Sequence, residues 1–475
     1  MKAASRKIIT PANGLERCVD GGRTETGWHA VWTRRSAALQ NCFRPSLKVA
    51  LCDDWKAVPM HGFHWLGLAA LMLVSPLSGC MTAPGPEPDI FPARTEGAVR
   101  IATFNAYLNR PAEGALIADL RSGDAQARKV AEIIQRAAPD ILLLNEFDYD
   151  AAGEAIALFR QNYLGVSQNG APVIDYPYIF LAPSNTGLPS GHDLDRDGAV
   201  SPQPGSRAYG GDAFGYGEFP GQYAMVLLSK YPLAESAART FQTFLWKDMP
   251  GALLPADWYD AAALADFRLS SKSHWDVPVL IGGKSVHILA SHPTPPSFDG
   301  PEDRNGKRNH DEIRFWSDYV GGAGGYIYDD TGAEGGLAPG ACFVILGDLN
   351  ADPYDGDDLA RRAINRLLDQ PETADRDAPE SRGGAAAAVR QGGANIGKSG
   401  PPAQQTADFG DDAESGVGNL RLDYVIPSRA CLETVRTGVV WPAPGHPHYD
   451  LVGPGYPIES SDHRIVWRDV IVVEN

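Results

Sequence analysis

Polar side chains stand at the ends of apolar runs in several separate stretches of this chain, and their types suit metal-assisted chemistry. The run Phe343–Leu346 ends in Gly-Asp-Leu-Asn, which places Asp348 and Asn350 two residues apart. Side chains at positions i and i+2 of a strand point to the same side, so these two can face one ligand. Carboxylate and amide oxygens suit a hard cation such as Mg²⁺ or Mn²⁺. The other strand-end groups are Asn105, Glu146, His292, Asp423, Asp462 and His463.

The histidines add a second kind of chemistry. His463 directly follows Asp462, and an imidazole beside an acid suits proton handling or phosphate contact near neutral pH. A single strand-end acid is usually a solvated turn residue, and a lone histidine usually has no role in a site. So many such groups, each next to an apolar strand, favour one shared site.

The apolar runs predict the elements that would carry these groups. Val99–Phe104, the helical repeat Asp124–Ala138 and the buried run Ile141–Leu144 predict a β-α-β unit that ends two strands on Asn105 and Glu146. Strands outnumber helices, and the helices come singly, which favours a two-sheet core with helices outside. The remaining predicted elements are a helix at His310–Tyr319 and strands at Met225–Leu228, Val277–Ile281, Val286–Ala290, Phe343–Leu346, Tyr424–Ile426 and within Arg464–Val473.

Three stretches are predicted to be insertions into this core: residues 183–222, 240–270 and 370–418. The last is rich in Gly, Ala, Gln and Ser, and we expect a mobile surface loop there.

Six short motifs resemble one known family. "FNAYLN", "LLLNE", "ASHP", "GDLNADP", "LDYVIPS" and "SDHRIV" occur in the order typical of the endonuclease/exonuclease/phosphatase superfamily. That group includes pancreatic-type deoxyribonucleases, abasic-site endonucleases, neutral sphingomyelinases and inositol polyphosphate 5-phosphatases. The resemblance covers residues 97–475 and implies a four-layered α/β sandwich, in which two packed mixed β-sheets are flanked by helices.

The resemblance also implies a role for each residue. Glu146, assisted by Asn105, would hold the metal, and Asp462 would serve metal binding or orientation. Asp348 would orient or deprotonate the attacking water. Asn350 would donate a hydrogen bond to the phosphate. His463 would contact a phosphate oxygen and would be oriented by Asp423. His292 would act as the acid.

Composition limits the substrate without identifying it. Hydrophobic residues make up 43% of the 475 residues, enough for a sizeable core. The net charge of −17 argues against tight, nonspecific nucleic-acid binding, which relies on Lys and Arg neutralising phosphates. It does not exclude a metalloenzyme whose cations meet the phosphate. A phosphorylated small molecule, a lipid headgroup and a nucleic acid therefore all stay open as substrates.

The front of the chain predicts export. Residues 60–80 contain a short apolar stretch that ends in Leu-Ser-Gly-Cys, which resembles the lipobox of bacterial lipoproteins with Cys80 as the lipidated residue. We expect Met60 to be the true start and residues 1–59 to be a doubtful upstream extension. Residues 81–96 are Pro-rich and predict a tether. The catalytic domain would then be a monomer, anchored through lipid to the bacterial cell envelope.

Two further groups of charged residues suggest additional sites. Asp193, Asp195 and Asp197, followed by Gly198, match the first half of an EF-hand-type calcium loop, although Pro204 stands where the bidentate Glu is expected. A later acid such as Asp212 would have to replace it, and a solvated acidic turn is the alternative.

A basic island follows His292 in this acidic chain. Its Arg304 and Arg308 are candidates for binding a second phosphate or an anionic headgroup, with surface charges leading into a helix as the alternative. Lys272 and His274 are a weaker candidate pair for the same task.

The two cysteines of the predicted core suggest a disulfide. If Asp348 and Asp423 are opposite each other on antiparallel strands, Cys342 faces position 429, two residues from Cys431. Diagonal neighbours lie about 7–8 Å apart, slightly far for a bridge, but a bulge would close the gap.

These observations together predict an exported, divalent-metal-dependent phosphoesterase that uses Mg²⁺ or Mn²⁺, with Ca²⁺ as a possible structural ion. An extracellular nuclease is the first alternative. A catalytically idle surface binding protein is the second, and the full set of polar groups argues against it.

Overall fold

The computed structural model describes residues 89–357, 359, 362–375, 377–410, 416–453 and 459–473. All of them belong to the second of two compact units, Ala50–Asn475. The predictions for residues 1–88, which include the upstream extension, the export signal with Cys80 and most of the tether, lie outside the described residues. In the described ranges, no helix combines the length and the apolar character that a membrane crossing requires.

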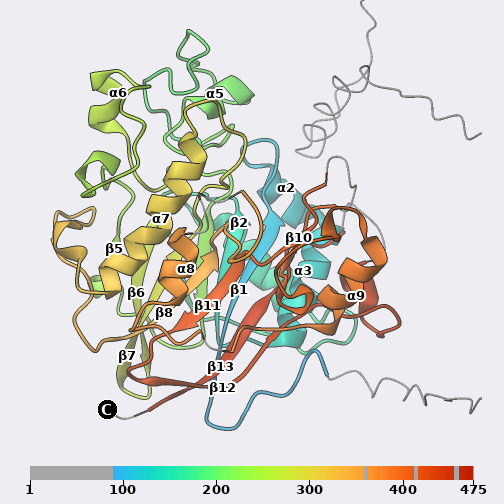
Figure 1. Ribbon diagram of the computed structural model, residues 1–475. Helices are drawn as coiled ribbons and strands as arrows, with labels where there is room; N and C mark the ends of the chain where they lie inside the picture. Colours follow the sequence, from blue (N-terminus) through green and yellow to red (C-terminus); the bar gives the residue numbers. More distant parts are fainter. Residues whose placement is uncertain are drawn as a thin grey trace, which may run out of the picture. The chain divides into compact units, whose positions relative to one another are not determined.

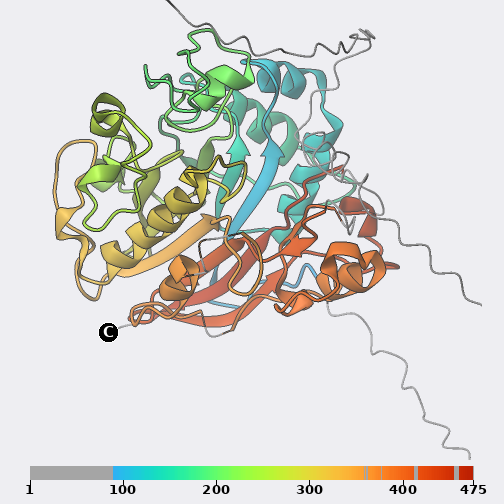
Figure 2. The same cartoon turned by 45° about the horizontal axis from the view of Figure 1, so that its top comes forward.

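Two large mixed sheets form the centre of the fold (Figures 1 and 2). The first has the strand order β12-β13-β1-β2-β4-β3, the second has the order β11-β8-β7-β6-β5, and β9 pairs with β10 separately. The strands are β1 Val99–Leu108, β2 Ile141–Phe147, β3 Tyr178–Phe180, β4 Met225–Ser229, β5 Arg239–Thr240, β6 His274–Ile281, β7 Lys284–Ser291, β8 Cys342–Asp348, β9 Ala407–Asp408, β10 Asn419–Leu420, β11 Asp423–Pro427, β12 Leu432–Val439 and β13 Val466–Val472.

Helices cover the outer faces of the two sheets, which gives the four predicted layers. Figures 1 and 2 show α7 and α8 on one side of the domain and α2 and α3 on the other. The α-helices are α2 Ala115–Ser122, α3 Ala125–Ala137, α4 Glu154–Phe159, α5 Arg207–Gly211, α6 Ala261–Asp266, α7 Arg304–Val320, α8 Arg362–Leu368 and α9 Arg382–Gln391.

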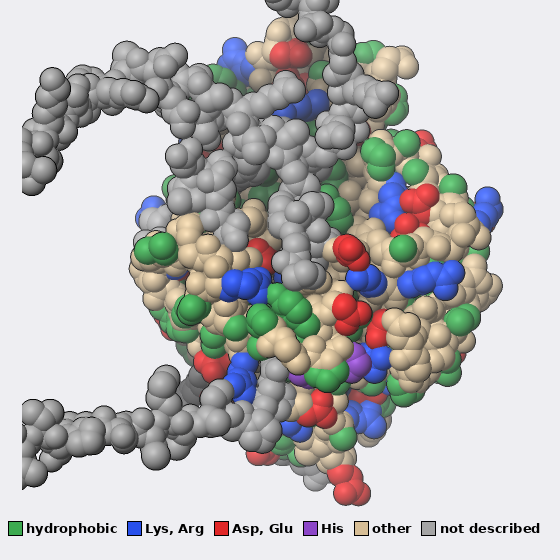
Figure 3. Space-filling view, turned by 90° about the vertical axis from the view of Figure 1, so that its right-hand side faces the viewer, with side chains coloured by type: hydrophobic (Ala, Val, Ile, Leu, Met, Phe, Trp, Pro, Cys, Tyr) green, Lys and Arg blue, Asp and Glu red, His purple; other side chains and the backbone are tan. Residues whose placement is uncertain are grey.

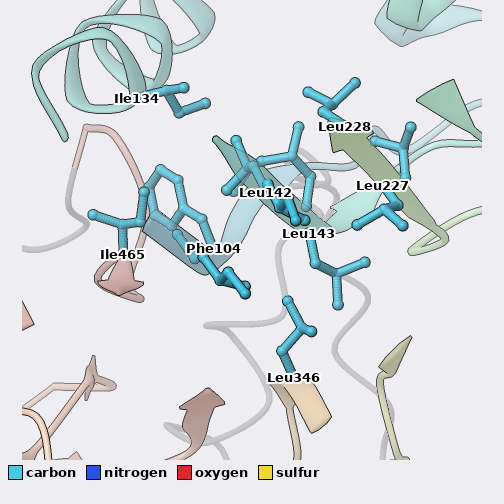
Figure 4. Close-up of a cluster of buried hydrophobic side chains, with 14 of the residues drawn as sticks. Phe104, Ile134, Leu142, Leu143, Leu227, Leu228, Leu346 and Ile465 are labelled. Carbon is cyan, nitrogen blue, oxygen red and sulfur yellow. The ribbon is translucent and has the colours of Figure 1, made fainter. Parts of the chain in front are cut away.

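The layering explains why the run Phe343–Leu346 is apolar at every position. Val344 and Leu346 join the core between the two sheets, whereas Phe343 and Ile345 join the outer core under α7 and α8. A strand with both faces covered needs apolar side chains on both. Figure 4 shows the inner side, with Leu346 on one side of the first sheet and Ile134 of α3 on the other.

The register of β8 and β11 is the predicted one. Asp423 lies opposite Asp348, and the two strands are antiparallel. Cys342 and Cys431 are joined by a disulfide, with their Cα atoms 5.6 Å apart. The disulfide therefore links β8 covalently to the segment that follows β11.

The stretch 370–418 differs from its prediction as a mobile loop. It contains α9, and Gln405, Thr406 and Ala407 are buried. Ala407 also forms a β-bridge with His463. Gly and Ala are frequent here because α9 packs closely: a Cβ on Gly383 would lie 1.9 Å from the carbonyl oxygen of Trp441. The small residues thus reflect close packing, which composition alone cannot distinguish from a loop.

Candidate active site

Strand direction brings the predicted polar groups together at one end of the two sheets. β1 and β2 are parallel, so Asn105 and Glu146 lie at neighbouring carboxyl ends. β7 and β8 are also parallel, which places His292 beside Asp348. β11 and β13 run antiparallel to their neighbours, so their beginnings, with Asp423, Asp462 and His463, reach the same place.

Asn105 links the two sheets. Its amide nitrogen Nδ2 donates to Glu146 Oε1 at 3.1 Å and to Asp348 Oδ2 at 3.0 Å. Glu146 belongs to the first sheet and Asp348 to the second, so one buried side chain fixes the distance between the metal-binding and the water-activating candidates.

His463 is held by an acid, as predicted. Its Nδ1–H donates to Asp423 Oδ2 at 2.8 Å, and Thr406 Oγ1 donates to the same oxygen at 2.7 Å. The other ring nitrogen, Nε2, lies 3.6 Å from Asp348 Oδ2. Asp423 therefore orients the imidazole so that Nε2 faces the centre of the site.

His292 and Asn350 complete the second sheet's contribution. His292 Nε2 lies 3.5 Å from Asp348 Oδ2, while its Nδ1 is buried without a hydrogen-bond partner. Asn350 donates its backbone N–H to Asp348 Oδ1 at 2.9 Å and its side-chain amide to the carbonyl oxygen of Pro293 at 3.0 Å. The part of Asn350 as a phosphate donor stays a prediction.

The backbone around these groups adopts rare conformations. Tyr107, Glu146 and Asn350 have φ of 51°, 55° and 51°, in the left-handed region that non-glycine residues seldom occupy. Gly347 has φ of 149°, and a Cβ there would lie 1.9 Å from the carbonyl oxygen of Ser291. The glycine before Asp348 thus allows β7 and β8 to approach each other where their site residues meet. Such outliers often mark functional sites.

The charges of the site shift its pKa values in opposite directions. Exclusion of solvent, together with the charge of Asp462, raises the pKa of Glu146 to about 7. Burial raises the pKa of Asp348 to about 6. Burial also disfavours the charged form of His463, but Asp423 and Asp348 outweigh it and raise the pKa of His463 to about 10. Burial, Lys272 and His463 lower the pKa of His292 well below its ordinary range.

The carboxylates present fit a divalent cation. Asp348 and Asp423 hold oxygens within 4.8 Å of each other and of a His463 ring nitrogen, and His463 in its protonated form would contact phosphate and not the cation. Glu146 and Asp462 add two more carboxylates close by, since each raises the pKa of a neighbouring group. Asp423 Oδ1 is buried without a hydrogen-bond partner. Carboxylates that crowd together out of water favour a cation in their midst.

Three side chains of the site were not among the assigned catalytic or metal-binding residues. Asn109 donates its amide to Glu146 Oε2 at 2.7 Å, and it ends the quoted motif "FNAYLN". Thr406 lies in the stretch predicted as a loop, so no sequence signal pointed to it. Lys272, the weaker candidate, is buried close enough to Glu312, Glu146 and Asp348 to be affected by their charges.

The other basic candidates lie elsewhere. Arg308 is buried and donates to the backbone carbonyls of Arg268, Leu269 and Ser270. Arg304 donates to the carbonyl of Leu194 at 3.0 Å. His274 is enclosed by Ser270 Oγ and the carbonyl of Glu312. These contacts give all three residues partners within the protein, and they do not favour the predicted anion-binding role.

The three aspartates of the calcium-like loop also lie together. Asp193, Asp195 and Asp197 hold potential ligand atoms within 4.8 Å of one another, and the last two are exposed. Asp212, the suggested replacement for the missing Glu, accepts backbone N–H groups of Leu194 and Ser201. Calcium binding here stays a prediction.

The surface over α2, α3 and α9 carries charges of both signs. Figure 3 shows basic and acidic side chains interspersed on this face where described residues are visible. On α3, Lys129 pairs with Glu459 and Arg136 with Glu132. This mixed pattern differs from the continuous basic face that duplex DNA requires.

The fold has the form of an α/β sandwich of the phosphoesterase type, with acids at its strand ends and a histidine, His463, bound to Asp423. The family model for the Endonuclease/Exonuclease/phosphatase family matches residues 102–463, so the chain belongs to that family. Members of this family hydrolyse phosphoester bonds. A comparison with curated proteins found no match.

Several solved structures are similar to this chain. An endonuclease/exonuclease/phosphatase from Beutenbergia cavernae is 16% identical, with 79% of this chain and 72% of that chain covered and a TM-score of 0.43. Sphingomyelinase C from Streptomyces griseocarneus is 15% identical, with 78% and 99% covered and a TM-score of 0.36. The catalytic domain of human Nocturnin is 14% identical, with 81% and 98% covered and a TM-score of 0.39.

Proposed function

We propose that this protein is a divalent-metal-dependent phosphoesterase that acts by attack of water on a phosphomonoester or phosphodiester. The observation that carries the proposal is the hydrogen-bonded link from Glu146 through Asn105 to Asp348, with His463 and its acid Asp423 beside it. This arrangement supplies a cation site, a base and a cationic phosphate contact within one buried cluster.

The cation would be held by Glu146 with Asn105, and Asp462 would serve binding or orientation. When bound, Mg²⁺ or Mn²⁺ neutralises phosphate oxygens and lowers the pKa of water. The remaining tasks belong to the chain's own side chains.

Asp348 accepts a proton from the attacking water or orients it, because its carboxylate lies at the centre of the cluster. His463 is protonated at neutral pH, so its Nε2–H can donate to a phosphate oxygen. His292 is neutral in the free enzyme because of its lowered pKa. The negative charge of a bound phosphate would raise that pKa and so favour His292 as the proton donor to the leaving group.

We favour a small or lipid-linked substrate over duplex DNA. The net charge of −17 supports this preference. Burial lowers the pKa of Lys272, which lies beside the catalytic carboxylates, and a bound phosphate would favour its charged form. We also propose that the protein is exported and anchored through Cys80, as the lipobox-like sequence suggests.

The test of function is a hydrolysis screen. Purified residues 81–475 would be incubated with chromogenic phosphate mono- and diesters, sphingomyelin vesicles and plasmid DNA, each with Mg²⁺, Mn²⁺, Ca²⁺ or EDTA. Metal-dependent hydrolysis of any ester supports the proposal, and cleavage of DNA alone would favour the nuclease alternative. Hydrolysis that persists in EDTA would contradict the proposal, and so would a lack of hydrolysis on every substrate.

A further inference from the structure

One face of α7 carries buried polar side chains that reach three loops of the active site. Arg308, Glu312 and Trp316 follow one another at intervals of four residues, and Asn309 lies three residues before Glu312, so the four share a side of the helix. None of them belongs to the catalytic cluster described above. Arg308, Asn309 and Glu312 bind loop residues next to that cluster, and Trp316 binds the last residue of β7. The helix therefore does more than cover the second sheet.

Glu312 has the most specific contacts of the four. Its Oε1 accepts from the backbone N–H of Ser271 at 2.6 Å and from Ser271 Oγ at 2.9 Å. Its Oε2 accepts from the backbone N–H of Thr294 at 2.8 Å. Ser271 precedes Lys272, and Thr294 lies two residues after His292. One carboxylate thus holds the loop of the buried lysine and the loop of the catalytic histidine candidate.

Asn309 extends the same arrangement to the third loop. Its Nδ2 donates to the carbonyl oxygens of Thr294 at 2.9 Å and Leu349 at 3.0 Å, and Leu349 lies between Asp348 and Asn350. Trp316 Nε1 donates to Ser291 Oγ at 2.9 Å, directly before His292. The loops that carry Lys272, His292 and Asp348 are therefore joined through one helix.

We propose that Glu312 is a positioning residue, which sets the relative placement of the Lys272 and His292 loops for the reaction. The proposal rests on the phosphoesterase function for its catalytic consequence, but the placement itself can be measured without activity. A carboxylate is needed because both oxygens must accept. A glutamine offers one acceptor oxygen and one donor amide, so it can satisfy Ser271 or Thr294 but not both.

The preceding residue offers a matched control. Asp311 is as buried as Glu312, and its Oδ2 accepts from Trp246 Nε1 and from the backbone N–H of Leu253, both at 2.6 Å. The segment it holds, 246–253, carries no site residue. Removing either carboxylate leaves buried N–H groups without an acceptor, so the general damage to folding should be similar.

The experiment compares Glu312→Ala, Glu312→Gln and Asp311→Ala with the wild type. Steady-state kinetics on the best chromogenic ester from the screen would give kcat and KM, scaled to the folded fraction. Amide hydrogen exchange would report protection at Ser271 and Thr294, and at Leu253 for the control. Ser271→Ala is the milder variant if Glu312→Ala does not fold, because it removes only the hydroxyl donor.

We expect Glu312→Ala and Glu312→Gln to lower kcat by about 10-fold to 10²-fold with a smaller change in KM, the scale of misplaced catalytic groups. Exchange should speed up at Ser271 or Thr294. Asp311→Ala should lose protection at Leu253 only and keep its kcat. Wild-type kcat in Glu312→Gln with unchanged exchange, or an equal loss of kcat in Asp311→Ala, would overturn the proposal. If the wild type hydrolyses no ester, the proposed function fails, and exchange at Ser271 and Thr294 alone decides the positioning role.

Discussion

Two clusters of potential metal ligands in this chain are similar in their spacing and differ in sequence origin and in burial. Both place three potential ligand atoms within 4.8 Å of one another. Asp348, Asp423 and His463 are all buried and come from three separate segments. Asp193 and its two partners come from one turn and are largely open to solvent. The first cluster therefore needs the whole fold, whereas the second needs only a local turn.

The difference shows what burial adds to a set of acids. In the turn, the carboxylates accept local backbone N–H groups: Asp193 Oδ2 accepts that of Gly198 and Asp197 accepts that of Ala199, while Asp193 Oδ1 has no hydrogen-bond partner among the described residues. Such bonds are the usual contacts of Asp in turns. In the buried cluster, burial raises the pKa of Asp348 to about 6, which means that folding disfavours its charge. Carboxyl groups with pKa values shifted in this way cluster at functional sites.

The largest expected effect concerns the removal of one acid from each cluster. Asp348→Ala should lower kcat by about 10²-fold to 10⁴-fold, because it removes the base candidate. Asp195→Ala removes the same charge from the exposed turn and should leave kcat unchanged. Steady-state kinetics on the best ester of the screen would measure both. Equal activity of Asp348→Ala and the wild type would show that the buried cluster, like the exposed turn, has no catalytic role.

The second largest expected effect is stabilisation of the folded protein by a cation bound in the active site. At a free Mg²⁺ concentration about 100 times its Kd, the free energy of unfolding should rise by about 2.7 kcal/mol. Glu146→Gln should lose most of this rise, since Glu146 is the main carboxylate proposed for the cation. Urea unfolding with Mg²⁺ and with EDTA gives the difference. A full Mg²⁺ effect in Glu146→Gln would remove that residue from the metal site.

Much of the buried cluster could be predicted because strand ends are visible in sequence. Asp348, Asn350 and Glu146 each follow an apolar run that is buried on both faces, and such runs end abruptly. The register of Asp348 with Asp423 was assumed in predicting the disulfide, and both the register and the disulfide are confirmed.

Site contributions from outside the strand ends could not be predicted in this way. Thr406 and Glu312 act through hydrogen bonds to residues 17 and 41 positions away in the chain. No periodicity marks such partners, because the contact depends on how whole elements pack. Arg308 shows a related limit, because a basic side chain next to a predicted site can donate to backbone carbonyls, and the sequence does not reveal these contacts.

Two buried histidines allow the role of partners to be tested by pH. His463 faces acids and has a raised pKa, whereas burial without an acid partner lowers the pKa of His274 to about 4 from its ordinary 6.5. Between about pH 4 and pH 6.5, His274 binds more protons in the unfolded chain than in the folded protein. The stability due to neutral His274 is therefore complete above pH 6.5 and falls as the pH drops toward 4.

From about pH 7 to about pH 5 this loss should reach about 2 kcal/mol. His274→Gln removes the titrating group and should flatten the pH dependence by that amount. Urea unfolding of both proteins across this range in EDTA would measure it. If the two proteins show parallel curves, His274 does not hold the neutral form that its contacts with Ser270 and Glu312 indicate.

The smallest expected effect belongs to the exposed turn. Ca²⁺ takes six to eight oxygen ligands, and an exposed site with few free carboxylate oxygens binds weakly. Since Asp212 already serves backbone N–H groups, the turn offers mainly Asp193, Asp195 and Asp197. We expect Ca²⁺ to add about 1 kcal/mol of stability when its concentration is several times Kd. Asp195→Ala should abolish this gain, while Glu146→Gln should keep it, because the two clusters use different residues. Thermal unfolding with Ca²⁺ and with EDTA would show the difference, and a wild type whose Tm does not respond to Ca²⁺ would identify the turn as a solvated one.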